Sequence, residues 1–442
     1  MTVASARIPA GRAIVAALAL VACGAILLLT RSYNFYFDEW DFILAAPDWT
    51  WLSYLQPHNE HPAIIPRLIY AVLLNTAGLR TYMPSMAILL LLHAVNVVLV
   101  FELVRRRSGD VVGFGAASLL LLLGAGWENL LWAFQITFVG SVACGLGALL
   151  ALEQPSTKRS LAAVAALTTA SLMFSGIGLF FLIAATVHLA AQRARRRDLL
   201  WLVPTAVAVV VWYVTIGRSG APANPPPTVH NLLVAPLYVV WGLGQAAAGL
   251  IGEGGWWGPP ALLAAVAVVA WDWWRRRPDA FALAVAAALL SMYAVTGLTR
   301  AQFGYEQSGA GRYVYEGALF WVLLLSDAAR RLPWRGTWRP ALMACVFLVC
   351  FNSAALLFEF GTAKAAQMQR EGADLQALDA ARGDPCLIPA GSPDALVMAQ
   401  LNSPRLYYRA VDRYGDPAPP LPVTDRAAYA AALATLQRSG CR

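Results

Sequence analysis

Three carboxylates and five aromatic side chains crowd one short stretch near the start of the chain. FYFDEWDF, residues 35–42, places Asp38, Glu39 and Asp41 within four positions. Crowded like charges repel and an aromatic surround excludes water, so both effects raise a carboxylate pKa toward the range of a general base. The stretch therefore indicates proton transfer. The alternative is an aromatic belt at a membrane surface whose carboxylates face water.

A second polar stretch follows soon after. PHNEHP, residues 57–62, brings together His58, Glu60 and His61. Imidazole and carboxylate ligands suit several divalent metal ions, and Asp38 would have to complete such a shell. Hydrogen bonding to sugar hydroxyls or to phosphate is a second interpretation, and a structural loop at the membrane surface is a third. The sequence requires no cofactor, and a divalent metal ion stays open as an alternative.

Two arginines lie in a glycine- and tyrosine-rich stretch late in the chain. TRAQFGYEQSGAGRYVYEG, residues 299–317, contains Arg300, Arg312 and Tyr313. Arginine holds phosphate through paired donors in a fixed geometry, and glycine lets the backbone come close to a ligand. These three residues are candidates for binding a donor phosphate. The alternative is an ordinary loop whose arginines reach the membrane surface.

Another candidate contact lies in GAGWENLLWAFQITF, residues 124–138. Trp127 could stack on a sugar face, and Glu128 is an acid close to a predicted membrane surface. An acid in that position is costly unless it has a role or a partner. Both residues are therefore candidates for substrate binding, although tryptophans also form interfacial belts without any ligand.

The composition identifies a membrane protein that crosses the bilayer several times. Of 442 residues, 59% are hydrophobic and only 13% are charged, whereas soluble domains carry about 25% charged residues. The net charge of +8 does not indicate nucleic acid binding, because the basic residues cluster at the ends of apolar runs. Such clusters mark the cytoplasmic loops of membrane proteins.

The basic clusters also predict the topology. They favour a cytoplasmic N-terminus, a first outer loop over residues 31–82 and an outer C-terminal tail, if 63–79 and 231–251 are juxtamembrane or re-entrant segments. The chain then lies in the plasma (inner) membrane. We expect about eleven transmembrane helices near residues 12–30, 83–104, 111–126, 130–152, 160–174, 176–192, 199–216, 258–274, 279–298, 313–329 and 340–359.

Two domains follow from this topology. Residues 1–360 form the transmembrane domain, and the polar tail, residues 361–442, is long enough for a small extracytoplasmic domain. The tail contains Cys386 and Cys441, which could pair in an oxidising compartment. Two cysteines alone do not fix a geometry, so the free-thiol alternative stays open.

The motif and topology resemble the GT-C glycosyltransferases. An Asp-Glu pair in a long first outer loop, directly after the first span, is similar to their pattern, and FDEWDF is closest to the Phe-Asp-Glu-x-His-Phe stretch of protein O-mannosyltransferases. GRYVY, residues 311–315, resembles the Arg-Tyr pair that many members carry before a late span. This chain has Asp41 where the motif has histidine, and it lacks a large luminal β-domain. The resemblance implies an all-α polytopic fold and does not imply a protein acceptor.

The resemblance also implies a chemistry. Such enzymes transfer a sugar, with inversion, from a polyprenyl-phosphate donor to a hydroxyl on the outer face. Asp38 would be the general base, Glu39 would orient the acceptor, and Asp41 is the second candidate base. The acceptor would be a glycan, a lipid or another hydroxyl compound, with membrane lipids around the protein and no nucleic acid.

A transporter or flippase of a lipid-linked saccharide is the alternative function, and an assembly subunit of an envelope complex is a third. Transporters carry polar residues and broken helices at mid-membrane. Here the charges gather at one surface and the deep parts of the spans are nearly free of charge, which favours the enzyme.

Overall fold

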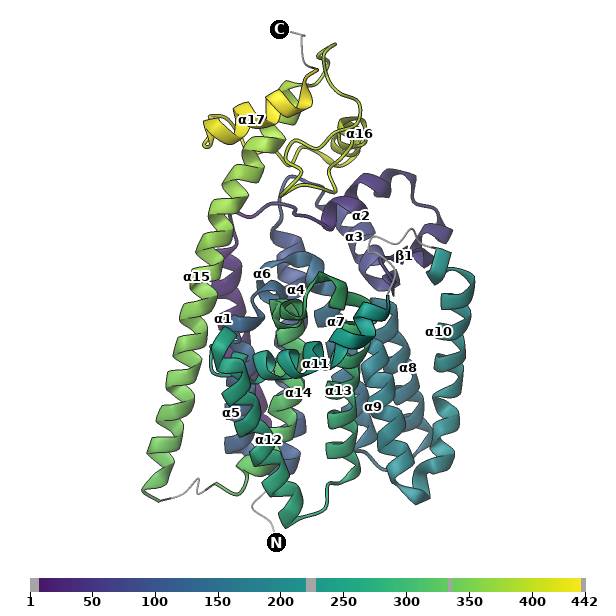
Figure 1. The fold of residues 1–442 in the computed structure, drawn as a ribbon, viewed down its shortest axis with the longest axis vertical. Coiled ribbons are helices and arrows are strands. Elements are labelled where there is room, and N and C mark those ends of the chain that lie inside the picture. Colours follow the sequence, from purple (N-terminus) through teal and green to yellow (C-terminus); the bar gives the residue numbers. More distant parts are fainter. Residues whose placement is uncertain (1–7, 220–227, 333–335, 439–442) are drawn as a thin grey trace.

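The structure, a computed structural model, describes residues 8–219, 228–332 and 336–438. Figure 1 shows an upright bundle of helices with the N-terminus at one end and the C-terminal tail beyond the other. Each of the eleven predicted spans overlaps one helix of this bundle, although α15 extends well beyond residue 359. These helices are α1 (Ile8–Leu29), α4 (Met83–Ser108), α5 (Asp110–Leu121), α7 (Ile136–Leu152), α8 (Lys158–Phe174), α9 (Gly178–Ala191), α10 (Val203–Thr215), α12 (Gly258–Arg275), α13 (Ala280–Arg300), α14 (Gly311–Ala329) and α15 (Trp338–Ala380).

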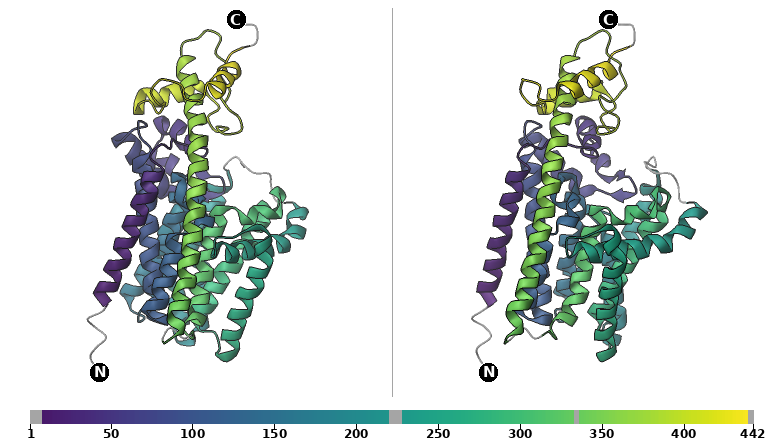
Figure 2. Two further views of the ribbon diagram at one scale, coloured as in Figure 1. Left: turned by 90° about the vertical axis from the view of Figure 1, so that its left-hand side faces the viewer. Right: turned by 60° about the vertical axis from the view of Figure 1, so that its left-hand side comes forward.

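Within the described ranges, 6 helices are long and apolar enough to cross a membrane, or 7 if the bent pair at residues 193–215 is one span. The 6 include α11 (Val229–Gly249), which covers most of the segment predicted to be juxtamembrane. In Figures 1 and 2, however, α11 lies across the bundle rather than along it. Its direction therefore agrees with a juxtamembrane helix, while the number of spans stays a prediction.

Small residues let the central helices approach closely. A Cβ atom at Gly140 of α7 would lie 2.4 Å from the ring of Phe174, at the end of α8. At Gly145 it would lie 2.2 Å from the ring of Phe181 in α9. Because lipid provides no hydrophobic drive between helices, close packing of this kind is a main source of helix association in membranes.

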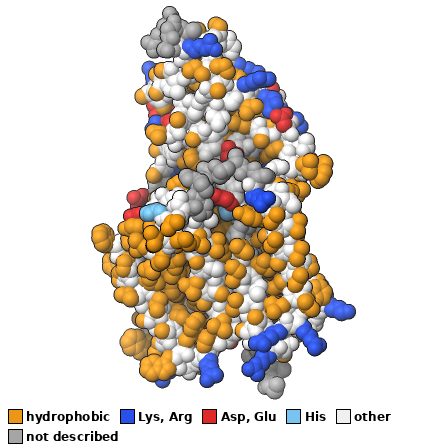
Figure 3. Space-filling view, turned by 45° about the vertical axis from the view of Figure 1, so that its right-hand side comes forward, with side chains coloured by type: hydrophobic (Ala, Val, Ile, Leu, Met, Phe, Trp, Pro, Cys, Tyr) orange, Lys and Arg blue, Asp and Glu red, His pale blue; other side chains and the backbone are white. Residues whose placement is uncertain are grey.

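Ion pairs collect at the N-terminal end of the bundle. Glu102 accepts hydrogen bonds from Arg12 of α1 and from Arg105 of its own helix. Arg107 pairs with Asp327 of α14 at 2.9 Å. Figure 3 shows Lys and Arg side chains along this end, below a broad apolar band. The predicted basic clusters thus gather at one end of the bundle, and the assignment of this end to the inner face stays a prediction.

The first loop folds back over the opposite end of the bundle. It contains α2 (Glu39–Ala45), a short hairpin of β1 (Pro57–His58) and β2 (His61–Pro62), and α3 (Ile64–Thr76). The hairpin is antiparallel and pairs His58 with His61. Its two-residue turn includes Asn59 at φ 51°, a left-handed conformation that asparagine tolerates better than most residues.

The tail is attached to an unusually long helix. α15 runs for 43 residues and passes residues 360 and 361, the predicted domain boundary, without a break. The tail continues with α16 (Pro404–Tyr414) and α17 (Arg426–Leu436). It packs on the first loop, where the Leu79 amide donates to the Tyr414 carbonyl at 2.9 Å. Cys441, one of the two tail cysteines that could pair, lies outside the described residues.

Candidate functional site

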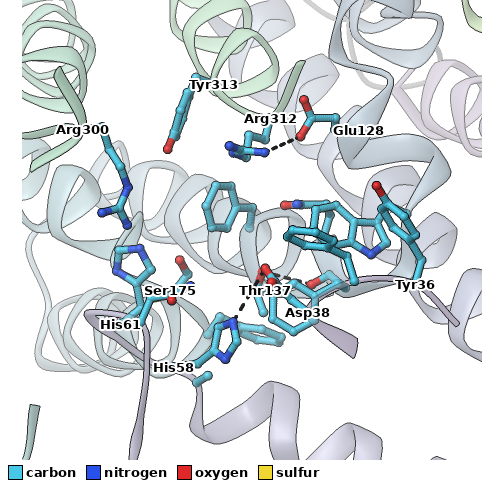
Figure 4. A pocket seen from close by; sticks show the side chains of 18 of the residues that line it. Tyr36, Asp38, His58, His61, Glu128, Thr137, Ser175, Arg300, Arg312 and Tyr313 are labelled. Carbon is cyan, nitrogen blue, oxygen red and sulfur yellow. Dashed lines mark hydrogen bonds and ion pairs between the residues drawn. The ribbon is translucent and has the colours of Figure 1, made fainter. Parts of the chain in front are cut away.

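A cavity of about 630 Å³ lies between the first loop, the start of α14 and the outer part of α15. Figure 4 shows its labelled side chains facing one another across the open space. Eight of the eleven residues singled out from the sequence line this cavity, and Glu39, Asp41 and Glu60 do not. The eight are Asp38, His58, His61, Trp127, Glu128, Arg300, Arg312 and Tyr313.

Asp38 stands at the N-cap of α2 and lines the cavity. The preceding residue, Phe37, has a φ of 48°, and a bulky residue in this region indicates backbone strain, which clusters at functional sites. Oδ2 of Asp38 lies 3.7 Å from Nε2 of His58. Its Oδ1 accepts a hydrogen bond of 3.3 Å from the side-chain amide of Gln400 in the tail. The carboxylate therefore has polar neighbours from both the first loop and the tail.

Glu39 is fully buried. It accepts a hydrogen bond of 2.8 Å from the Tyr36 amide and one of 2.6 Å from the Tyr70 hydroxyl. Burial raises the pKa of Glu39 to about 8. Its contacts stabilise the turn that precedes Asp38, so its place in the structure is beneath the loop rather than in the cavity.

Asp41 lies at the exposed rim, outside the cavity lining. Desolvation by its crowded surroundings raises the pKa of Asp41 to about 6, and the charge of Asp38 adds to the effect. One ligand atom from each of Asp38, Asp41 and His58 lies within 4.8 Å of the others. This group, and not the set of His58, Glu60 and His61 weighed from the sequence, has the spacing that a cation would need.

The two histidines of the hairpin have different surroundings. His58 packs on Phe134, with the ring centroids 4.9 Å apart. Burial lowers the pKa of His61 to about 4, so its ring is neutral at pH 7. Gly176 approaches the ring so closely that a Cβ there would lie 2.4 Å from Nδ1 of His61. His61 is therefore held against the turn between α8 and α9.

Each cavity arginine is fixed by a carboxylate. Arg300, at the end of α13, donates two hydrogen bonds to Glu60, of 3.0 and 2.6 Å. Arg312, in the first turn of α14, donates to Glu128 at 2.7 Å. Its guanidinium also lies 5.2 Å from the centre of the Tyr313 ring. These pairs hold two guanidinium groups at the cavity wall before any ligand binds.

Other cavity residues carry no motif and were missed by the sequence reasoning. Trp127 is stacked on Phe360 of α15 at 4.9 Å, so α15 forms part of the wall. Lys364, on the same helix, and Gln400, in the tail, also line the cavity. The single signal for Lys364 is the scarcity of lysine in the chain. Nothing in the sequence marks Gln400.

The fold is similar to that of a solved protein, ArnT. ArnT from Cupriavidus metallidurans matches in its crystal structure bound to undecaprenyl phosphate with a TM-score of 0.56 and 13% identity, over 87% of this chain and 82% of that chain. Its apo structure matches with a TM-score of 0.58 and 14% identity, over 85% and 80%. No protein-family model matches, and no curated protein matches.

These likenesses show the fold. The chain is an all-α membrane protein that crosses the bilayer several times, with a fold similar to that of ArnT. The resemblance to the first-loop motif of the O-mannosyltransferases stays a prediction.

Proposed function

We propose that this protein is an integral-membrane glycosyltransferase. It transfers a sugar from a polyprenyl-phosphate donor to an acceptor hydroxyl on the extracytoplasmic face of the plasma membrane, with inversion and with Asp38 as general base. The observation that carries the proposal is the single cavity in Figure 4, where Asp38 faces Arg300 and Arg312 from the opposite side. The similarity to the structure of ArnT bound to undecaprenyl phosphate supports the same donor class.

The proposed reaction is a displacement at the anomeric carbon. The acceptor oxygen forms the new bond to that carbon while its proton passes to a carboxylate oxygen of Asp38. The bond from the anomeric carbon to the phosphate oxygen breaks, and the polyprenyl phosphate leaves with the electron pair. One base suffices because the configuration inverts in a single step. Asp41, at the rim, is the second candidate base.

The arginines act on the leaving group. The phosphate gains negative charge as the bond breaks, so a cation already in place stabilises the transition state more than the ground state. Glu60 and Glu128 hold Arg300 and Arg312 at the wall, and little reorganisation is needed during the reaction. Tyr313 lies beside them as a further donor to phosphate.

A divalent metal ion is an alternative feature of the same site. Asp38, Asp41 and His58 would hold it, and it would supply positive charge close to the acceptor oxygen. A carboxylate that binds a metal ion is a weaker base, so Asp38 would not be the general base in this arrangement. Activity that is lost with a chelator and restored by one divalent ion would support the metal.

The test is the Asp38→Asn variant. Asparagine has nearly the same size and still accepts the hydrogen bond from Gln400, but it cannot take the proton. A general base contributes about 10²- to 10⁴-fold, so turnover of a polyprenyl-phosphate sugar by purified protein should fall by that factor. Binding of the donor should persist.

Asp41→Asn is the matched control and should lose less activity. Normal turnover in Asp38→Asn together with an inactive Asp41→Asn would assign the base to Asp41. If both variants keep full activity, the proposed mechanism fails. A labelled donor that is moved across vesicles without being consumed in the presence of acceptors would support the transporter instead.

A further inference from the structure

Lys364 contributes a third cation to the cavity. It lies on α15, lines the cavity and is 7% exposed. Its ammonium lies 2.9 Å above the centre of the Tyr36 ring and donates to the side-chain oxygen of Gln367 at 3.1 Å. An ammonium has three donors. One bond goes to Gln367 and the ring face takes another direction, which leaves donor capacity for a ligand.

Lysine is rare in this chain. Of 33 Lys and Arg residues only Lys158 and Lys364 are lysines. Lys158 is exposed at the start of α8, at the opposite end of the bundle from the cavity. The chain therefore supplies almost all its positive charge through arginine, while a compact ammonium on a flexible stem faces the cavity.

The positive charge of Lys364 is not balanced by an ion pair. Among the described residues it pairs with no carboxylate, whereas Arg300 and Arg312 each have one. Glu39 and Glu371 are the buried acids that influence it most. Glu39 instead accepts hydrogen bonds from the Tyr36 amide and the Tyr70 hydroxyl, and it forms no ion pair with Lys364.

Glu371 is not paired with Lys364 either. Both of its carboxyl oxygens are buried without a hydrogen-bond partner among the described residues, and such surroundings favour the neutral acid. A buried ammonium without a counter-ion is costly. An anionic group of a ligand would supply the missing charge.

Lys364 lies away from Arg300, one of the two arginines that we assign to the donor phosphate. In Figure 4, Tyr36 lies at one end of the cavity and Arg300 at the other, with Asp38 between them. The ammonium lies against Tyr36. Because inversion requires the acceptor to attack from the side opposite the leaving phosphate, the acceptor occupies the end away from Arg300.

Building on the proposed function, we infer that Lys364 and Tyr36 form a subsite that binds a carboxylate or phosphate group on the acceptor saccharide. The enzyme is thereby selective for an anionic acceptor over a neutral one.

Amine modification tests this subsite without requiring turnover. The purified full-length protein is treated with a small water-soluble acetylating reagent, and mass spectrometry follows the rates at Lys364 and Lys158. At a probe concentration about ten times its Kd, the free site falls about tenfold. Glucuronate and glucose 6-phosphate should therefore slow modification of Lys364 about tenfold and leave Lys158, the internal control, unchanged. Glucose should protect neither lysine.

Two further arms separate the acceptor subsite from the donor site. Protection by glucose 6-phosphate should persist with polyprenyl phosphate present and in the Arg312→Ala variant. Protection by polyprenyl phosphate alone would assign Lys364 to the donor site and overturn the inference. Equal protection by glucose, or no modification of Lys364 at all, would overturn it too. Because the readout is binding, anionic protection in a protein without transferase activity would retain the subsite and reject only the proposed function.

Discussion

The buried carboxyl of Glu39 should make stability depend on pH in a defined direction. Its pKa is about 8 in the folded protein and about 4.5 when the chain is unfolded. Between these values the folded state binds more protons than the unfolded state, so the free energy of unfolding decreases as pH rises. This contribution is full below pH 4.5 and is lost progressively up to pH 8. From pH 5 to pH 7.5 the loss from this one group is about 3 kcal/mol.

The Glu39→Gln variant isolates this contribution. Glutamine resembles the neutral acid but does not titrate: its oxygen accepts the hydrogen bond from the Tyr36 amide, and its NH2 group donates to the Tyr70 hydroxyl. In thermal unfolding measured in detergent, the stability of the variant relative to the wild type should therefore increase as pH rises from 5 to 7.5. Glu306→Gln, at an exposed glutamate, is the control and should follow the wild type.

Other titrating groups, such as Asp41 and His61, are present in both proteins. Their contributions to the pH dependence therefore cancel when the variant is compared with the wild type. Parallel pH profiles for Glu39→Gln and wild type would refute the reasoning. A variant that loses stability equally at every pH would show that Glu39 serves as a charged acceptor.

Two further predictions concern the leaving phosphate and the topology. Arg312→Ala should reduce turnover about 10²- to 10³-fold. Arg312→Lys should lose less activity, because lysine keeps the charge although it lacks the planar donors. Full activity in the alanine variant would remove Arg312 from the mechanism. In a Cys345→Ser background, with the labelled positions located by mass spectrometry, a membrane-impermeant thiol reagent should label Ser32→Cys in intact cells and Ser156→Cys only after permeabilisation. Labelling of the latter in intact cells would contradict the predicted orientation.

The sequence was sufficient for the bundle and for most of the cavity wall. Apolar runs of suitable length located the helices, since crossing a bilayer leaves few other options. Side-chain direction in the first loop was harder to predict. α2 begins at Glu39, and residues three apart share a helix face, so Asp38 at the cavity wall and Asp41 at the exposed rim lie on one side of the helix while Glu39 points into the protein. That start depends on the turn at Phe37, which no sequence pattern marks.

Long-range partners explain the rest of what the sequence missed. Glu60 was a candidate ligand for substrate or metal, yet it binds Arg300, 240 positions away in the chain. Lys364 and Gln400 reach the cavity because α15 extends beyond the bundle and the tail folds back over the first loop. Such contacts depend on the tertiary arrangement and leave no local periodicity.

Because α15 is unbroken, it fixes both the distance of the tail from the bundle and the rotation of the tail about the helix axis. At Gly361 the helix is pressed against α1, where a Cβ would lie 2.4 Å from Leu29, and the Gly361 carbonyl accepts a hydrogen bond from Tyr33 at 2.7 Å. Each residue of an α-helix adds about 1.5 Å and about 100° of turn. One residue inserted between Gly361 and Lys364 would therefore move the ammonium to another side of the helix and carry α16 and α17 round with it. The number of residues between membrane and tail is thus constrained by helical phase, so natural or engineered length changes in this segment should be confined to whole turns.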